Sequence, residues 1–176
     1  MSDAWRTTPT LVGRHVTLRP LVAEDKDALV AVAATDDLWD IFYASVSQLK
    51  DADRWFAATF AQVEQGRALV FAVCDPAGAV VGTTRYMRMN EGHRRLEIGG
   101  TFYATRVQRT GVNTEAKRLL LTHAFDAMGV TRARFSVVGH GKRDPVATNA
   151  TAAGMRQNRR VEVTLLGRRA TEFARY

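Results

Sequence analysis

The chain has a single cysteine, Cys74, and no hydrophobic run of the length that a membrane-spanning helix needs. One cysteine cannot form a disulfide within the chain. Because Cys74 ends an apolar, strand-like stretch (VFAVC), we expect a small buried side chain rather than a reactive thiol. The first residues, MSDAWR, also lack the apolar segment of a signal peptide. These absences predict a cytoplasmic protein that does not enter a membrane.

The four histidines lack the spacing of a metal site. His15, His93 and His140 are scattered along the chain. His123 lies near two leucines on one face of a predicted helix, where packing against the core explains it. The sequence therefore predicts no bound metal ion.

The net charge of +7 is unevenly distributed. Residues 1–134 carry 17 basic and 15 acidic side chains, whereas residues 135–176 carry 8 basic and 3 acidic ones. A basic ending of this kind can bind nucleic acid or another polyanion. It contains no run of aromatic side chains between the basic ones and no known nucleic-acid motif, so we expect a solvated surface and no nucleic-acid partner.

Hydrophobic periodicity and turn residues predict the order of the elements. A chain of 176 residues has the length of a single domain. Residues 38–48 are aromatic-rich and irregular, and can either line a substrate groove or fold onto the core. The order of the elements predicts an α/β domain with a mixed sheet. We expect strands over residues 10–20, 68–75, 79–89 and 95–103, and helices over residues 26–34, 51–64 and 115–128.

The most informative segment is the glycine-containing turn over residues 108–114 (QRTGVNT), between the predicted strand and the last of these helices. Such a turn directs several backbone N–H groups and the positive end of a helix dipole at one point, which favours a phosphate group. Gly111 has no side chain to block the anion, Arg109 adds a positive charge, and Asn113 can cap the helix. The other interpretation is an ordinary loop between a strand and a helix.

With this turn in place, residues 8–135 resemble a GNAT-type N-acetyltransferase of the RimJ/RimL branch. The resemblance rests on LVGRHVTLRPL near the start, VGTTRY, LEIGG and above all QRTGVNTEAKRLLLTH. The last segment matches the family's acetyl-CoA motif, except that Asn113 stands where Gly or Ala is more common. The resemblance implies a GNAT-like α/β fold whose mixed, mostly antiparallel sheet is flanked by helices. It also implies acetyl-CoA as co-substrate, bound by Gln108, Arg109, Thr110, Gly111, Val112, Asn113 and Thr114.

The strand before the turn holds the other positions that the resemblance identifies. In such a family this strand binds the pantetheine arm through its backbone, here around Phe102. Glu97 matches a carboxylate that removes a proton from the attacking amine, which an ammonium needs before it can attack a thioester. Glu97 can equally be a strand carboxylate paired with Arg95 or Arg85. Gly100 replaces a larger residue and indicates a bulge, a close approach of ligand, or a weakened strand.

The end of the chain contains the motifs GHG, DPVATN and NRRVE. On these motifs, residues 135–166 resemble a different family, the end of an OmpA-like peptidoglycan-binding domain. The part of that domain that binds the peptide's carboxylates has no counterpart here, so we do not expect peptidoglycan binding. The segment still predicts a strand over 133–138, a helix over 149–157 and a strand over 160–166. Our hypothesis is that residues 136–176 complete the sheet of one domain over 1–176. Recombination, a designed chimera and a generated sequence remain alternative origins of this join.

The implied activity is transfer of an acetyl group from acetyl-CoA to an amine on a small molecule or a protein N-terminus. Many relatives take an acid for the departing thiolate, often a tyrosine, from the segment that is replaced here. The nearest tyrosine beyond the join is Tyr176. The sequence therefore also allows a module that binds CoA or a polyanion with little or no turnover.

Overall fold

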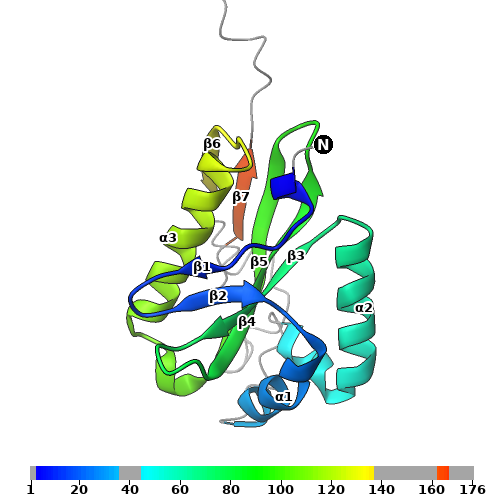
Figure 1. Cartoon of the computed structure of the whole chain (residues 1–176), viewed down its shortest axis with the longest axis vertical. Coiled ribbons are helices and arrows are strands. Elements are labelled where there is room, and N and C mark those ends of the chain that lie inside the picture. The colour runs from blue at the N-terminus through cyan, green and yellow to red at the C-terminus, as the bar shows by residue number, and fades with distance from the viewer. Residues whose placement is uncertain (1–2, 36–44, 137–161, 167–176) are drawn as a thin grey trace, which may run out of the picture.

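The computed structural model describes residues 3–35, 45–136 and 162–166. Figure 1 shows a central sheet with helices packed around it. The elements are the 3-10 helix η1 (Asp3–Trp5), strands β1 (Leu11–Val12) and β2 (Thr17–Pro20), the 3-10 helix η2 (Ala23–Asp25), helix α1 (Lys26–Ala34), the 3-10 helix η4 (Ser45–Asp51), helix α2 (Ala52–Glu64), strands β3 (Leu69–Cys74), β4 (Val80–Asn90) and β5 (Arg95–Tyr103), the 3-10 helix η5 (Thr105–Val107), helix α3 (Gly111–Asp126), and strands β6 (Arg132–Ser136) and β7 (Glu162–Leu166).

The described strands form one sheet in the order β1-β2-β3-β4-β5-β7-β6. Each neighbouring pair is antiparallel. The prediction of a mixed sheet is therefore wrong for the described strands, which contain no parallel pair. The cause is the position of β7. Strands β5 and β6 run in the same direction on either side of α3 in the sequence, but β7 lies between them and pairs with both.

Helices α1 and α2 begin and end where local signals predict. Helix α1 has the predicted bounds. Asp51 caps α2, because its side chain accepts a hydrogen bond from the Arg54 N–H at 3.2 Å. Gly66, at φ +66°, ends this helix as expected for a glycine in the left-handed region. The predicted irregular segment over 38–48 lies mostly outside the described residues.

The single strand predicted over residues 10–20 is wrong, because the chain turns back on itself there. Strands β1 and β2 pair with each other, with Leu11 opposite Leu18. The N–H of Gly13 donates to the carbonyl of Val16 at 2.8 Å and closes the turn. The alternation of apolar and polar residues continues through this turn, so periodicity alone did not reveal it.

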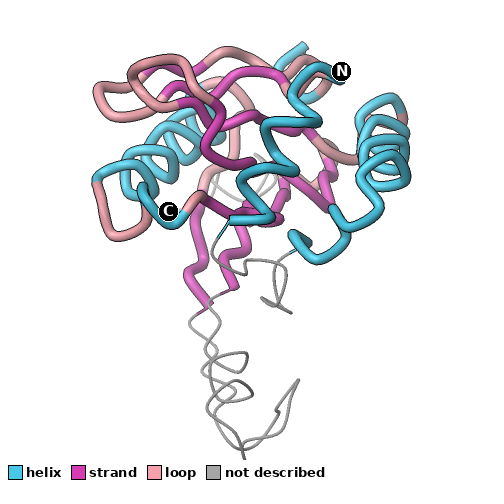
Figure 2. The backbone as a smooth tube through the Cα atoms, turned by 90° about the horizontal axis from the view of Figure 1, so that it is seen from below, coloured by secondary structure: helices cyan, strands magenta, loops and turns pink. Residues whose placement is uncertain are grey.

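The core has two layers, one on each face of the sheet (Figures 1 and 2). On one face α3 packs against the strands through a stripe of residues that includes Val112, Ala116 and Leu120. On the other face α1 and α2 form a second cluster, which contains Trp55. Cys74 belongs to this second cluster and is buried and free, as predicted.

Candidate functional site

The turn after β5 leads into α3 through a residue with left-handed backbone geometry. Arg109 has φ +60°, a conformation that non-glycine residues rarely adopt. The next residue, Thr110, caps the helix, since its hydroxyl oxygen accepts a hydrogen bond from the Val112 N–H at 3.3 Å. The helix therefore begins at Gly111 and not at residue 115. The prediction that Asn113 caps the helix is wrong, because the threonine three residues earlier already does so.

Because α3 begins at Gly111, the N-terminal end of the helix lies at the glycine of the turn. The N–H groups in the first turn of a helix have no carbonyl partner within the helix, and the helix dipole adds positive potential there. A Cβ atom on Gly111 would lie 3.0 Å from Cδ2 of His15, tighter than an ordinary contact. Gly111 therefore allows the ring of His15 to pack against the start of α3, and the exposed side chains of Arg109 and His15 lie beside the first N–H groups of the helix.

His15 reaches the site because the β1–β2 turn docks onto α3. The carboxylate of Glu115 accepts hydrogen bonds from the backbone N–H groups of His15 and Arg14. These bonds hold the pKa of Glu115 below its usual value. A Cβ on Gly13 would lie 2.5 Å from the same carboxyl group, so this turn needs a glycine. His15 was not predicted as a site residue. Glu115 lies 100 residues further along the chain, and no local signal indicates that the two residues meet.

Gln108 and Phe102, two other predicted cofactor residues, both contact neighbouring backbone at the end of β5. The side-chain amide of Gln108 donates to the carbonyl of Tyr103 at 2.9 Å and ties the turn to the end of β5. Phe102 is buried in β5 and pairs with Thr83 of β4. Its carbonyl lies against Gly82, where a Cβ atom would be only 2.1 Å away. Val112 is buried in the core, whereas Asn113 and Thr114 are exposed near the start of α3.

Glu97 lies near the opposite end of β5 from the turn. Its carboxylate pairs with Arg88 of β4 at 3.2 Å, not with Arg95 or Arg85 as the sequence allowed. Arg88 has φ +50°, which turns it out of the regular alternation of the strand. Six residues of strand separate Glu97 from Tyr103, or about 20 Å at 3.3 Å per residue. The structure does not bring Glu97 into contact with the turn, and a ligand joining the two would have to be long.

Strand β5 contains the bulge that Gly100 suggests. Thr83 pairs with Phe102, but Arg85 pairs with Gly99, so β5 carries one extra residue between these pairs. Gly100 lies there at φ +56°. Strand β7 pairs only with Leu96 and Glu97 of β5. Within the described chain, the outer edge of β5 from residue 98 onward therefore has no strand beside it.

A polar cluster on the α3 face was not predicted. The ammonium group of Lys117 donates to the hydroxyls of Thr101 at 2.8 Å and Thr84 at 3.4 Å. Burial lowers the pKa of Lys117 to about 8. The same side chain lines a groove of about 650 Å³ along α3, together with Asn113 and Thr114. Lys117 thus lies in a groove shared with two residues of the predicted cofactor turn.

On the other face of the sheet, Arg85 is a buried cation that has two nitrogen atoms without a hydrogen-bond partner among the described residues. The residue is 8% exposed, and its Nε and Nη2 atoms contact no acceptor among the described residues. Its guanidinium lies 5.3 Å from the ring centre of Trp55. A desolvated cation–π contact contributes about 2 kcal/mol, less than the several kcal/mol that burying an ion costs. Burial lowers the pKa of Arg85, but the group stays charged near neutral pH.

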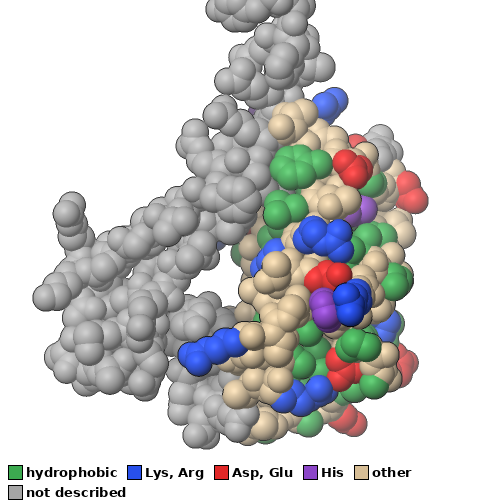
Figure 3. Space-filling view, turned by 90° about the vertical axis from the view of Figure 1, so that its left-hand side faces the viewer, with side chains coloured by type: hydrophobic (Ala, Val, Ile, Leu, Met, Phe, Trp, Pro, Cys, Tyr) green, Lys and Arg blue, Asp and Glu red, His purple; other side chains and the backbone are tan. Residues whose placement is uncertain are grey.

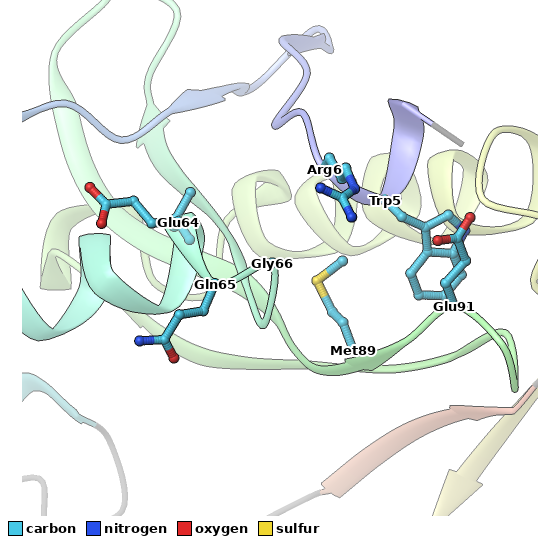
Figure 4. Close-up of a pocket in the computed structure, with 8 residues that line it drawn as sticks. Trp5, Arg6, Glu64, Gln65, Gly66, Met89 and Glu91 are labelled. Atoms are coloured by element: carbon cyan, nitrogen blue, oxygen red, sulfur yellow. The ribbon is translucent and has the colours of Figure 1, made fainter. Parts of the chain in front are cut away.

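A second cavity, of about 490 Å³, lies at the end of α2 beside the β4–β5 turn. Figure 4 shows Glu64, Met89 and Glu91 around it, and none of the predicted site residues. Figure 3 shows acidic and basic side chains intermingled on the side of the molecule where α3 lies. The described residues contain no cluster that could hold a metal ion. No helix among them is long and apolar enough to cross a membrane.

The order of the elements and the glycine-containing turn before α3 agree with a known family. The family model of the acetyltransferase (GNAT) domain matches residues 15–141. The chain belongs to the GNAT acetyltransferase family. This match includes Glu97, the turn and α3, and extends six residues past the join predicted near residue 135. The described residues omit most of the segment that resembles OmpA, so that resemblance remains a prediction.

Solved GNAT structures share the fold at low sequence identity. RimJ from Mycobacterium smegmatis, in complex with CoA-disulfide, has a TM-score of 0.61 and 17% identity, over 99% of this chain and 93% of that one. A GCN5-related N-acetyltransferase from Brucella melitensis has a TM-score of 0.59 and 21% identity, over 95% and 81%. The microcin C7 self-immunity acetyltransferase MccE, in complex with acetyl-CoA and AMP, has a TM-score of 0.61 and 15% identity, over 92% and 96%. No curated protein sequence matches the chain.

Proposed function

We propose that this GNAT protein transfers the acetyl group of acetyl-CoA to an amine. The observation that carries the proposal is the start of α3, where the N–H groups of the first helical turn lie beside the exposed side chains of Arg109 and His15. When bound, acetyl-CoA supplies an acetyl group activated as a thioester. The N–H groups of Gly111 and Asn113 would hold its pyrophosphate, the side chain of Arg109 would add positive charge, and His15 would lie beside them.

The length of β5 supports a division of roles along the strand. Glu97 and the end of β5 at Tyr103 are about 20 Å apart along the strand, so an extended pantetheine arm suits the space between an acceptor amine near Glu97 and a phosphate at the turn beyond Tyr103. The carboxylate of Glu97, partly exposed, would take a proton from the attacking amine, directly or through water. Arg88 holds that carboxylate in place until the acceptor arrives.

The acceptor is an amine on a small molecule or on a protein N-terminus. If the OmpA-like segment replaces the part that supplies an acid in relatives, departure of the thiolate is slow and turnover is reduced. In the limiting case the chain binds CoA without catalysis. Measuring acetyl-CoA binding separately from turnover distinguishes these outcomes.

The binding part of the proposal is tested by calorimetry with acetyl-CoA and the variant Gly111→Asp. An acidic side chain in the first turn of a helix is compatible with the helix dipole, so the variant should fold. It should nevertheless lose binding, because the carboxylate lies at the start of the helix and repels phosphate. The matched control is Gly92→Asp. Gly92 lies in the turn at the far end of β5, and a Cβ atom there has only ordinary contacts.

We expect wild type and Gly92→Asp to bind acetyl-CoA with similar affinity, and Gly111→Asp to bind at least tenfold more weakly. Equal binding by all three proteins would remove the turn from the cofactor site. Absence of binding by wild type would reject the acetyl-CoA proposal itself.

A further inference from the structure

Arg85 presents to the interior the edge of its guanidinium that is suited to a carboxylate. The two atoms without a partner are Nε and Nη2. Their N–H bonds lie side by side on one edge of the planar group, where the two oxygens of a carboxylate can accept parallel hydrogen bonds. Buried polar groups without partners are rare in folded proteins, and a bound ligand is one of the explanations for them. Trp55 covers a face of the guanidinium and leaves this edge unpaired.

The side chain of Arg85 lies on the face of the sheet away from α3. Its neighbours Thr84 and Tyr86 direct their side chains to α3, where they contact Lys117 and the carbonyl of Leu120. Alternation along a strand therefore places Arg85 on the side of α1 and α2. The Nε atom of Arg85 lies against Gly100 of β5, where an added Cβ atom would be 2.7 Å from it. The bulge in β5 thus accommodates the guanidinium.

Arg85 and Glu97 share this face of the sheet. Arg85 pairs with Gly99, and Met87 pairs with Glu97, on the same side of the two strands. Residues in this diagonal relation are about 7–8 Å apart. A ligand can therefore place an acidic group against Arg85 while its amine lies beside Glu97.

We propose that Arg85 binds a carboxylate on the acceptor, so that the preferred acceptor is an amine that also carries an acidic group a few bonds away. This inference rests on the proposed acetyl transfer and narrows its substrate class to amino-acid-like molecules. The carboxylate accepts hydrogen bonds from Nε and Nη2, and this pairing holds the amine next to Glu97. A plain alkylamine or a polyamine lacks the group that pairs with Arg85.

The phosphates of CoA are the other source of an anion for Arg85. They are expected at the start of α3, beyond the end of β5, whereas Arg85 pairs with the middle of β5 and faces the opposite layer. Acetyl-CoA affinity should therefore not depend on Arg85. Calorimetry with Arg85→Met tests this point directly, and weaker acetyl-CoA binding by this variant would overturn the assignment to the acceptor.

The acceptor assignment is tested with two acid–amide pairs, glycine and glycinamide, and β-alanine and β-alaninamide, with rates expressed per concentration of unprotonated amine because acid and amide also differ in the pKa of the amine. Thiol release from acetyl-CoA gives kcat/KM for each. We expect wild type to favour the acid in at least one pair by about tenfold or more, the effect of a charge-assisted double hydrogen bond. Arg85→Met should lose this preference, so that its kcat/KM values for the acid and the amide become similar. Arg85→Lys, which keeps the charge but not the paired donors, should retain part of it.

Arg95→Met is the matched control, because Arg95 is an exposed arginine at the start of β5 and should leave the preference intact. A wild type that favours the amides or shows no preference overturns the inference and leaves the proposed acetyl transfer standing. No thiol release with any amine rejects the proposed transfer instead. In that case thermal unfolding still tests Arg85: β-alanine should raise the Tm of wild type and not of Arg85→Met, and an equal effect on both overturns the site.

Discussion

At the scale of single residues, Glu97 is either the base that deprotonates the acceptor or a structural carboxylate paired with Arg88, and variants of the two residues distinguish these roles. If Glu97 is the base, Glu97→Gln should lower the rate of thiol release at neutral pH by about 10²- to 10⁴-fold, the usual effect of a positioned base. Arg88→Gln breaks the same pair but keeps the carboxylate, so its rate should stay within a few-fold of wild type. Equal losses in both variants would show that the pair, and not the base, matters. An unchanged Glu97→Gln would leave Glu97 a structural residue.

Lys117 gives a prediction about stability and pH. Burial lowers the pKa of its ammonium to about 8 in the folded chain, against about 10.4 in the unfolded chain. Between these values the unfolded state holds a proton that the folded state has lost, so the stability contribution of Lys117 increases with pH. Relative to Lys117→Met, wild type should gain up to about 2 kcal/mol in free energy of unfolding between pH 7 and pH 9.5.

Urea unfolding across this range measures the gain, with Lys26→Met as the control. Lys26 is an exposed lysine whose pKa is raised by Asp53, so its contribution should stay constant until the pH exceeds 10. Measurements stop below pH 10, because burial raises the pKa values of Tyr86 and Tyr103, and unfolded tyrosines begin to ionise there. A flat difference between wild type and Lys117→Met would mean that Lys117 keeps an ordinary pKa.

At the scale of elements, the sequence predicted well those segments that local chemistry defines. The turn between β3 and β4 is an example. The side chain of Asp75 accepts hydrogen bonds from the N–H groups of Ala77 and Ala79, and Gly78 adopts φ +84°. All the contacts that define this turn lie within five residues of sequence. The predicted start of α3 was four residues too late. Thr110 and Asn113 are both good caps, and only the path of the chain in the fold decides which of them caps the helix.

The elements that prediction missed depend on contacts far apart in sequence. The β1–β2 turn forms where Glu115 can bind its backbone, and that places His15 beside Gly111. The turn between β5 and α3 could be predicted because its signal is local: a glycine between a strand and a helix. The environments of Arg85 and Lys117 could not, because each depends on which residues of β5, α2 and α3 come together across the sheet.

At the scale of the whole molecule, the described chain closes its sheet with its last strand. Thr164 of β7 pairs with Glu97 of β5 on one side and with Arg134 of β6 on the other. Removing β7 would leave β6 without a neighbour among the described strands. Strand β7 therefore connects β6 to the rest of the described sheet.

This arrangement predicts that Thr164→Pro destabilises the whole chain and not only its end. Proline removes the backbone N–H and fits poorly in a strand with neighbours on both sides, whereas the matched variant Thr164→Val keeps the N–H and a strand-forming side chain. We expect Thr164→Pro to lower the Tm by several degrees, and Thr164→Val to change it little. Limited proteolysis of wild type should give no stable fragment ending near residue 135. Such a fragment, with an unchanged Tm in Thr164→Pro, would show that the sheet is complete without β7 and that the ending is an appendage.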